Sequence, residues 1–133
     1  MPAERPLRIL YVDDELVNLK LVKAVIAFVL KRPDEVVAVS SGAEGLERLA
    51  AGVPFDVVLS DQRMPGMSGT QFLAQVKQKY PAAARVIVTG YNDDPDVRLA
   101  QRSGLAQAII PKPWQSQEMY DTLCAAVARH RKG

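Results

Sequence analysis

Residues 56–69 read DVVLSDQRMPGMSG, and this stretch indicates the fold class most directly. After Asp56 it continues as a Val and Leu run without polar alternation, which is typical of a parallel strand covered by helices on both faces. The run ends on Asp61, and Pro65 and Gly66 then turn the chain. Burying an acid at the end of a strand costs free energy. An acid found there therefore suggests a function. We therefore treat Asp61 as the first candidate functional residue.

Outward from this stretch, short apolar runs alternate with longer helical patterns. The expected strands are residues 8–12, 36–40, 57–61, 85–89 and 108–111. Helix starts are indicated at Ser41 and Ser68, each with Glu or Gln three residues later, and at Asp94 directly before a proline. Five strands alternating with five helices predict an α/β fold, a doubly wound five-stranded parallel sheet with right-handed crossovers.

The first and last helices carry more detailed expectations. The first, at about residues 15–30, is apolar on nearly all sides, which predicts unusually deep burial. The last has Met119, Leu123 and Val127 along one face, with Cys124 beside them as a core residue. A basic tail at 129–133 follows, either as the favourable positive end of a helix or as the start of a link to another domain. We expect His130 in this tail to be solvated.

Length and composition limit the class of protein. The chain has 133 residues, of which 48% are hydrophobic and 24% charged, with a formal net charge of +2. These values are typical of a single soluble globular domain, which we place at residues 1–133 with its core at about 7–127. The small net charge argues against direct nucleic-acid binding. No apolar run approaches the roughly 18 residues of a membrane span, so we expect no membrane association and a cytoplasmic protein.

Chemically active residues lie at, or directly after, the carboxyl ends of four of the expected strands. In order along the chain these are Asp13, Asp14 and Glu15, then Asp61, then Thr89, and then Lys112 between two prolines. Ligands of open parallel sheets bind at the carboxyl ends of the strands, so we expect these side chains to meet there. Gathered carboxylates repel one another unless a cation compensates, and an all-oxygen ligand set favours Mg²⁺ or Mn²⁺. An aspartate in such a site can attack phosphorus to form an acyl phosphate.

This set of residues resembles the receiver domain of two-component response regulators. The resemblance lies in Asp13-Asp14 after LYV, Asp61 in LSDQRMPGMSG, Thr89 in VTGY and Lys112 in IPKPW, and it covers about residues 7–127. It implies a flavodoxin-like sheet of strand order 2-1-3-4-5. It also implies that Asp61 accepts a phosphoryl group from the histidine of a sensor kinase or a histidine phosphotransfer protein, in a Mg-dependent phosphorelay. The chain would then be a signalling switch and not an enzyme with a substrate of its own.

The resemblance also implies a role for each site residue. Asp14 would bind Mg²⁺ directly and Asp13 mainly through water, with Asp61 and the backbone carbonyl of Arg63 completing the protein ligands. Lys112 would contact the phosphoryl group, and Thr89 would move toward it on activation. The Lys112–Pro113 bond would be cis. The face formed by the fourth helix, fifth strand and fifth helix would contact an output domain, a partner protein or a second copy of the chain.

Two features depart from the family or tune its chemistry. The family usually has Tyr or Phe three positions before the lysine, as a switch residue, whereas this chain has Ile109. We therefore do not expect the usual aromatic switch, and Tyr91, two residues after Thr89, is a disfavoured substitute for it. Arg63 and Tyr91 occupy the positions that flank the phosphoryl group in the family. Because both are bulky, we expect slow access of water and slow hydrolysis of the acyl phosphate.

Two other functions stay open. One is a receiver-like interaction module that works without phosphorylation, although such modules usually lose an acid or the lysine. The other is a metal-dependent phosphatase with an Asp nucleophile, as in haloacid dehalogenase-like enzymes, which place an acid where this chain has Arg63. The sequence names neither the cognate kinase nor the output, and it fits a stand-alone regulator as well as a module of a longer protein.

Overall fold

The structure is a computed structural model that describes residues 6–91 and 93–132. Residues 1–5 and the last residue of the expected basic tail, Gly133, lie outside the described residues. The elements in chain order are β1 (Arg8–Val12), α1 (Leu16–Ala24), the π-helical turn η1 (Val25–Val29), β2 (Glu35–Val39), α2 (Gly42–Ala50), β3 (Val57–Asp61), α3 (Gly69–Lys79), β4 (Ala84–Thr89), α4 (Pro95–Ser103), β5 (Ala108–Pro111) and α5 (Ser116–Lys132).

The five strands form one parallel sheet in the order β2-β1-β3-β4-β5, which confirms the predicted fold class. The predicted strand limits agree with the structure to within one residue. Parallel pairing brings the carboxyl ends of β1, β3, β4 and β5 to one edge, since Val12 pairs with Ser60, Asp61 with Val88 and Thr89 with Pro111. Pro111 is tolerated because β5 is an edge strand.

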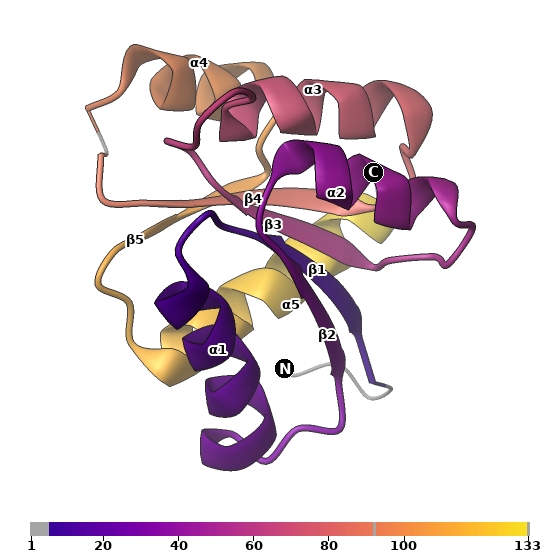
Figure 1. Ribbon diagram of the computed structural model, residues 1–133, viewed down its shortest axis with the longest axis vertical. Coiled ribbons are helices and arrows are strands. Elements are labelled where there is room, and N and C mark those ends of the chain that lie inside the picture. The colour runs from indigo at the N-terminus through magenta and orange to yellow at the C-terminus, as the bar shows by residue number, and fades with distance from the viewer. Residues whose placement is uncertain (1–5, 92, 133) are drawn as a thin grey trace.

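Helices cover both faces of the sheet, with α1 and α5 on one face and α2, α3 and α4 on the other (Figure 1). Alternate residues of each strand therefore enter two separate cores. In β1, for example, Ile9 and Tyr11 join the core under α1 and α5, while Leu10 and Val12 join the core under α2 and α3. All residues of β3 and β4 are buried, as their continuous apolar runs predict.

Helix starts follow the predicted capping chemistry, with one difference. Ser68 makes a complete capping box with Gln71, and Asp94 caps α4 ahead of Pro95. Ser41 accepts the backbone N–H of Glu44, but the Glu44 carboxylate accepts from the Ser40 hydroxyl and N–H instead of completing the box. The helix starts at Gly42, directly after Ser41, as expected, since one capping bond is enough to fix it.

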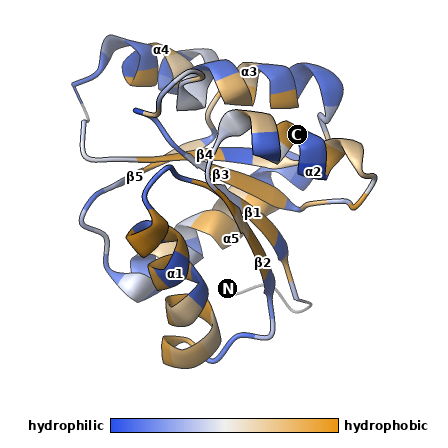
Figure 2. Cartoon of the chain, in the orientation of Figure 1, coloured by the Kyte–Doolittle hydropathy of each residue, from blue (hydrophilic) through white to orange (hydrophobic). Residues whose placement is uncertain are grey.

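The prediction of deep burial for the first helix is wrong. Only the side facing the sheet is buried, through Leu19 and Val22 of α1 and Val25 and Ile26 of η1. The outer side is exposed although it is apolar, and Figure 2 shows α1 as a largely hydrophobic helix at the outside of the molecule. The exposed apolar side chains are Leu16, Val17, Leu21, Phe28 and Val29. The sheet has one layer of helices on each face, so within the described residues no further element covers this side.

The basic tail continues α5 and packs against the loops that enter the strands. The His130 ring contacts the Pro81 carbonyl oxygen at 2.7 Å and Gln107 at 2.7 Å, so the expectation of a solvated His130 is wrong. Arg129 donates to the Gln107 carbonyl at 3.0 Å, and Arg131 pairs with Asp56. α5 is 17 residues long, and its last turn brings these side chains to the edge of the sheet where the strands begin. Among the described residues, no helix has the length and apolar content that a membrane crossing requires.

Gly69 provides a test of how closely α3 approaches the end of β3. A Cβ at this position would overlap the backbone oxygen of Asp61 and lie 3.0 Å from the Gln62 Cα. Because backbone atoms cannot move aside easily, we expect Gly69→Ala to lower the free energy of unfolding by about 2–3 kcal/mol. Gly90→Ala is the control, since the nearest atom to its Cβ would lie 4.0 Å away and the cost should stay below about 0.5 kcal/mol. Equal losses in urea unfolding would contradict this packing.

Candidate phosphoacceptor and metal site

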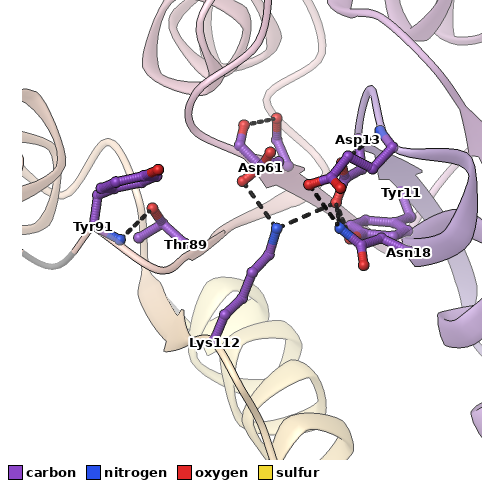
Figure 3. Close-up of polar contacts among 9 residues, drawn as sticks. Tyr11, Asp13, Asn18, Asp61, Thr89, Tyr91 and Lys112 are labelled. Carbon is purple, nitrogen blue, oxygen red and sulfur yellow. Dashed lines mark hydrogen bonds and ion pairs between the residues drawn. The ribbon is translucent and has the colours of Figure 1, made fainter.

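The carboxyl edge of the sheet brings together most of the residues singled out in the sequence. Asp13 and Asp14 follow β1, Asp61 ends β3, and Lys112 follows β5. Figure 3 shows the Lys112 ammonium between the carboxylates of Asp61 and Asp13. The predicted convergence of these side chains is therefore present in the fold, although they are up to 99 residues apart in sequence.

Lys112 links the two buried acids. Its Nζ lies 3.2 Å from Asp61 Oδ1 and 3.4 Å from Asp13 Oδ2. The side chain of Asp13 is fully buried and that of Asp61 is 10% exposed, whereas Lys112 retains 25% exposure. The Lys112–Pro113 peptide is cis, as predicted. The Lys112 ammonium thus compensates negative charge of Asp13 and Asp61, and the lysine side chain remains partly exposed to solvent.

Three carboxylates lie close enough to share a cation. One oxygen from each of Asp13, Asp14 and Asp61 lies within 4.8 Å of the others, with Asp14 exposed and the other two buried. The set offers only oxygen ligands, which is the chemistry that Mg²⁺ and Mn²⁺ prefer. The residues therefore fit such an ion. The expected contribution of the Arg63 carbonyl stays a prediction.

The electrostatics of the cluster favour an added positive charge. Burial raises the pKa of Asp61, and the Asp13 carboxylate raises it further, while Lys112 opposes both. Burial lowers the pKa of Lys112, but the carboxylates of Asp61 and Asp13 outweigh burial and the net shift is upward. One ammonium thus faces three carboxylates, so the negative charge is only partly compensated.

Asp13 has two polar neighbours that sequence reasoning missed. The Tyr11 hydroxyl donates to Asp13 Oδ2 at 2.6 Å, and the Asn18 amide donates to the same oxygen at 3.1 Å (Figure 3). The spacing offered a clue to Tyr11, because residues two apart on an extended segment point to the same face. Asn18 lies in the first turn of α1, and only the path of the chain after β1 brings it to Asp13.

Thr89 lies at the same edge of the sheet, but its hydroxyl is engaged by the following loop. The side chain is fully buried, and its Oγ1 accepts the backbone N–H of Tyr91 at 3.0 Å (Figure 3). The expected movement of Thr89 toward a phosphoryl group stays a prediction. In this structure the hydroxyl holds the start of the β4–α4 loop.

The side chains of Arg63 and Tyr91 lie against each other beside the site. The Arg63 guanidinium carbon is 3.7 Å from the centre of the Tyr91 ring, a cation–π arrangement. Arg63 Nε also lies 3.5 Å from Asp94 Oδ2, and the other oxygen of Asp94 caps α4. Arg63 therefore connects the β3–α3 loop with the start of α4. This contact between distant loops was not visible in the sequence.

Comparison with known proteins identifies the family. The family model for the response regulator receiver domain matches residues 9–124. The chain belongs to this family, whose members act in two-component signalling.

Individual relatives agree with this assignment. The hydrogenase transcriptional regulatory protein HoxA of Cupriavidus necator is 32% identical over 94% of this chain, which matches 25% of HoxA. The chain thus spans about a quarter of the length of the curated relatives it matches first.

Solved structures of receiver domains are similar to this chain in fold. The signal receiver domain of an HD domain-containing protein from Pseudomonas fluorescens superposes with a TM-score of 0.85 at 27% identity, covering 97% of this chain and all of that one. A response regulator receiver domain protein from Clostridium thermocellum gives a TM-score of 0.83 at 31% identity, covering 95% of this chain and 98% of that one.

The raised pKa of Asp61 has a consequence for stability. A folded-state pKa above the unfolded value means that the charged carboxylate destabilises the fold, fully so above the folded pKa and not at all below the unfolded one. In a buffer free of divalent metal at pH 7, we expect Asp61→Asn to raise the Tm by roughly 3–5 °C, or about 1 kcal/mol for a domain of this size. The gain should vanish as the pH falls below the unfolded pKa of aspartate. A thermal melt showing Asp61→Asn less stable at pH 7 would contradict the electrostatics.

Proposed function

We propose that this domain is a phosphoacceptor switch in which Asp61 takes a phosphoryl group from the histidine of a sensor kinase or a histidine phosphotransfer protein. The observation that carries the proposal is the Lys112 ammonium, which lies within 3.4 Å of both buried acids in a cluster able to hold a divalent cation. Family membership supports the same reading.

The chemistry needs positioning and charge compensation. A carboxylate oxygen of Asp61 attacks the phosphorus of the donor phosphoimidazole, so that an O–P bond forms and the P–N bond breaks. The imidazole leaves with the electron pair and takes up a proton. Lys112, at 3.2 Å from the Asp61 carboxylate, would neutralise charge on the transferred oxygens. When bound by Asp13, Asp14 and Asp61, Mg²⁺ would supply further positive charge to the same oxygens.

The exposed apolar side of α1 supports docking of a phosphodonor protein next to Asp61. Large exposed apolar patches mark interaction sites in soluble proteins. Leu21 of this side also lines a hollow of about 350 Å³, together with Tyr11, Asn18, Lys112, Pro113 and Trp114. The hollow includes the lysine that contacts Asp61, so a helix lying along α1 would bring its histidine to the acceptor. The sequence predicted that the first helix is deeply buried, but in this proposal its exposed apolar side chains bind a partner.

The β4–α4 loop offers a way for phosphorylation to reach α4 without an aromatic residue at position 109. If the Thr89 hydroxyl moves toward the phosphoryl group, it releases the N–H of Tyr91, whose carbonyl accepts the N–H of Asp94. Asp94 in turn caps α4. The change would then bias the face formed by α4, β5 and α5 toward an output domain, a partner protein or a homodimer. HoxA is a transcriptional regulatory protein, and three quarters of its length lie outside the match.

The two alternatives have less support. A module that works without phosphorylation has no need for the acid cluster and the bridging lysine, which this chain retains. An Asp-nucleophile phosphatase would place an acid at Arg63, whose side chain instead stacks on Tyr91.

Native mass measurement after incubation with acetyl phosphate and Mg²⁺ tests the proposal. We expect one phosphoryl adduct on the wild-type chain, no adduct without divalent metal, and none on Asp61→Ala. Asp121→Asn is the control, because this exposed acid on α5 lies outside the cluster. An adduct of unchanged yield on Asp61→Ala would overturn the assignment of the acceptor.

Hydrolysis of the adduct tests the role of the stacked pair. Arg63 and Tyr91 are bulky and hold each other in place, so we expect them to limit access of water to the acyl phosphate. Replacing both with Ala should speed dephosphorylation by about tenfold, which corresponds to about 1.4 kcal/mol in the barrier. The rate is followed by loss of the adduct mass over time. An unchanged lifetime would show that the pair does not control water.

A further inference from the structure

The buried hydroxyl of Tyr11 has no part in the chemistry described so far. Tyr11 is 1% exposed and lies in β1, at the bottom of the acid cluster. Its hydroxyl makes a 2.6 Å hydrogen bond to Asp13 Oδ2. A buried tyrosine that directs its one polar atom at a fully buried acid fixes that acid in the site.

The contacts of Asp13 show how its carboxylate is held. Oδ2 receives the Tyr11 hydroxyl, the Asn18 amide and, at 3.4 Å, the Lys112 ammonium. Among the residues that the structure describes, Oδ1 receives only the backbone N–H of Glu15, at 3.0 Å. A carboxylate has about four lone-pair positions, shared between its two oxygens. Oδ1 has a single donor, so it can still bind a cation or accept from a water that the cation holds.

The hydroxyl of Tyr11 acts as a donor toward Asp13. A carboxylate offers only acceptor positions, so the phenolic O–H donates in the 2.6 Å contact with Asp13 Oδ2.

We propose that Tyr11 is a positioning residue for the metal site, which holds the Asp13 carboxylate in the orientation that binds a divalent cation. The proposal rests on the metal binding contained in the proposed function. Hydrogen bonds to metal-ligating carboxylates typically affect metal affinity by 10- to 100-fold. Without the phenol, the carboxylate gains freedom to turn about its side-chain torsions, and binding an ion must then restore the lost order.

The test measures the Kd for Mn²⁺ by the paramagnetic resonance of the free ion, with Mg²⁺ as a competitor. We expect Tyr11→Phe to weaken Mn²⁺ binding by about tenfold. Tyr120→Phe is a matched control, because Tyr120 is also 1% exposed and also donates to an acid, Asp34, that is not among the metal-capable acids. It should lower the Tm to a similar extent and leave the Kd unchanged. A purely structural role for Tyr11 would move the Tm without moving the Kd.

Asn18→Ala keeps the test decisive if Tyr11→Phe folds poorly. Asn18 is only half-buried and donates to the same oxygen, so its loss should weaken Mn²⁺ binding in the same direction by about threefold or more. Equal or tighter Mn²⁺ binding in Tyr11→Phe, or in Asn18→Ala where the first variant does not fold, would overturn the proposal. Failure of the wild-type chain to bind Mn²⁺ would instead count against the proposed function itself.

Discussion

The partial neutralisation of two buried carboxylates by one lysine is the interaction on which the rest of the site depends. Asp13 and Asp61 come from neighbouring strands, and their burial is costly because each loses its hydration. Lys112 reaches both acids from the far side of β4, but it carries only one charge against three carboxylates. The negative charge of the carboxylates therefore exceeds the positive charge of the lysine. A divalent cation, alone or together with a phosphoryl group, would reduce this excess.

The fold makes this arrangement possible through the order of its strands. β1 and β3 are neighbours and place Asp13 and Asp61 side by side, while β4 places Thr89 between Asp61 and β5, the strand that Lys112 follows. The same edge carries the loops of Arg63 and Tyr91, which connect the site to α4. On the other side of the acids, Tyr11 and Asn18 fix Asp13. Tyr11 and Asn18 thus contact the cluster on one side, and the loops that carry Arg63 and Tyr91 border it on the other.

The sequence predicted most of the fold because its strongest patterns were local. Uninterrupted apolar runs marked β3 and β4, and Ser68 and Asp94 marked helix starts. Tertiary contacts did not override these local preferences. The burial of the first helix was wrong because hydropathy does not tell whether another layer exists to cover an apolar side. Phe28, for example, is 77% exposed in an apolar run.

The convergence of the candidate site residues was also predictable, because acids, an alcohol and an amine at strand ends must meet at one edge of a parallel sheet. Their neighbours were not. The Arg63–Tyr91 stack and the docking of His130 on Pro81 depend on how separate loops lie in space, which no spacing along the chain encodes.

Chemical trapping of the acyl phosphate tests the central claim most directly. Borohydride reduces a phosphorylated aspartate to homoserine, and peptide mass spectrometry then locates the modified position. After treatment with a phosphodonor and Mg²⁺, the account predicts homoserine at position 61 and an unmodified aspartate at positions 13 and 14. Homoserine at another position, or none in a chain that carries the adduct, would contradict it.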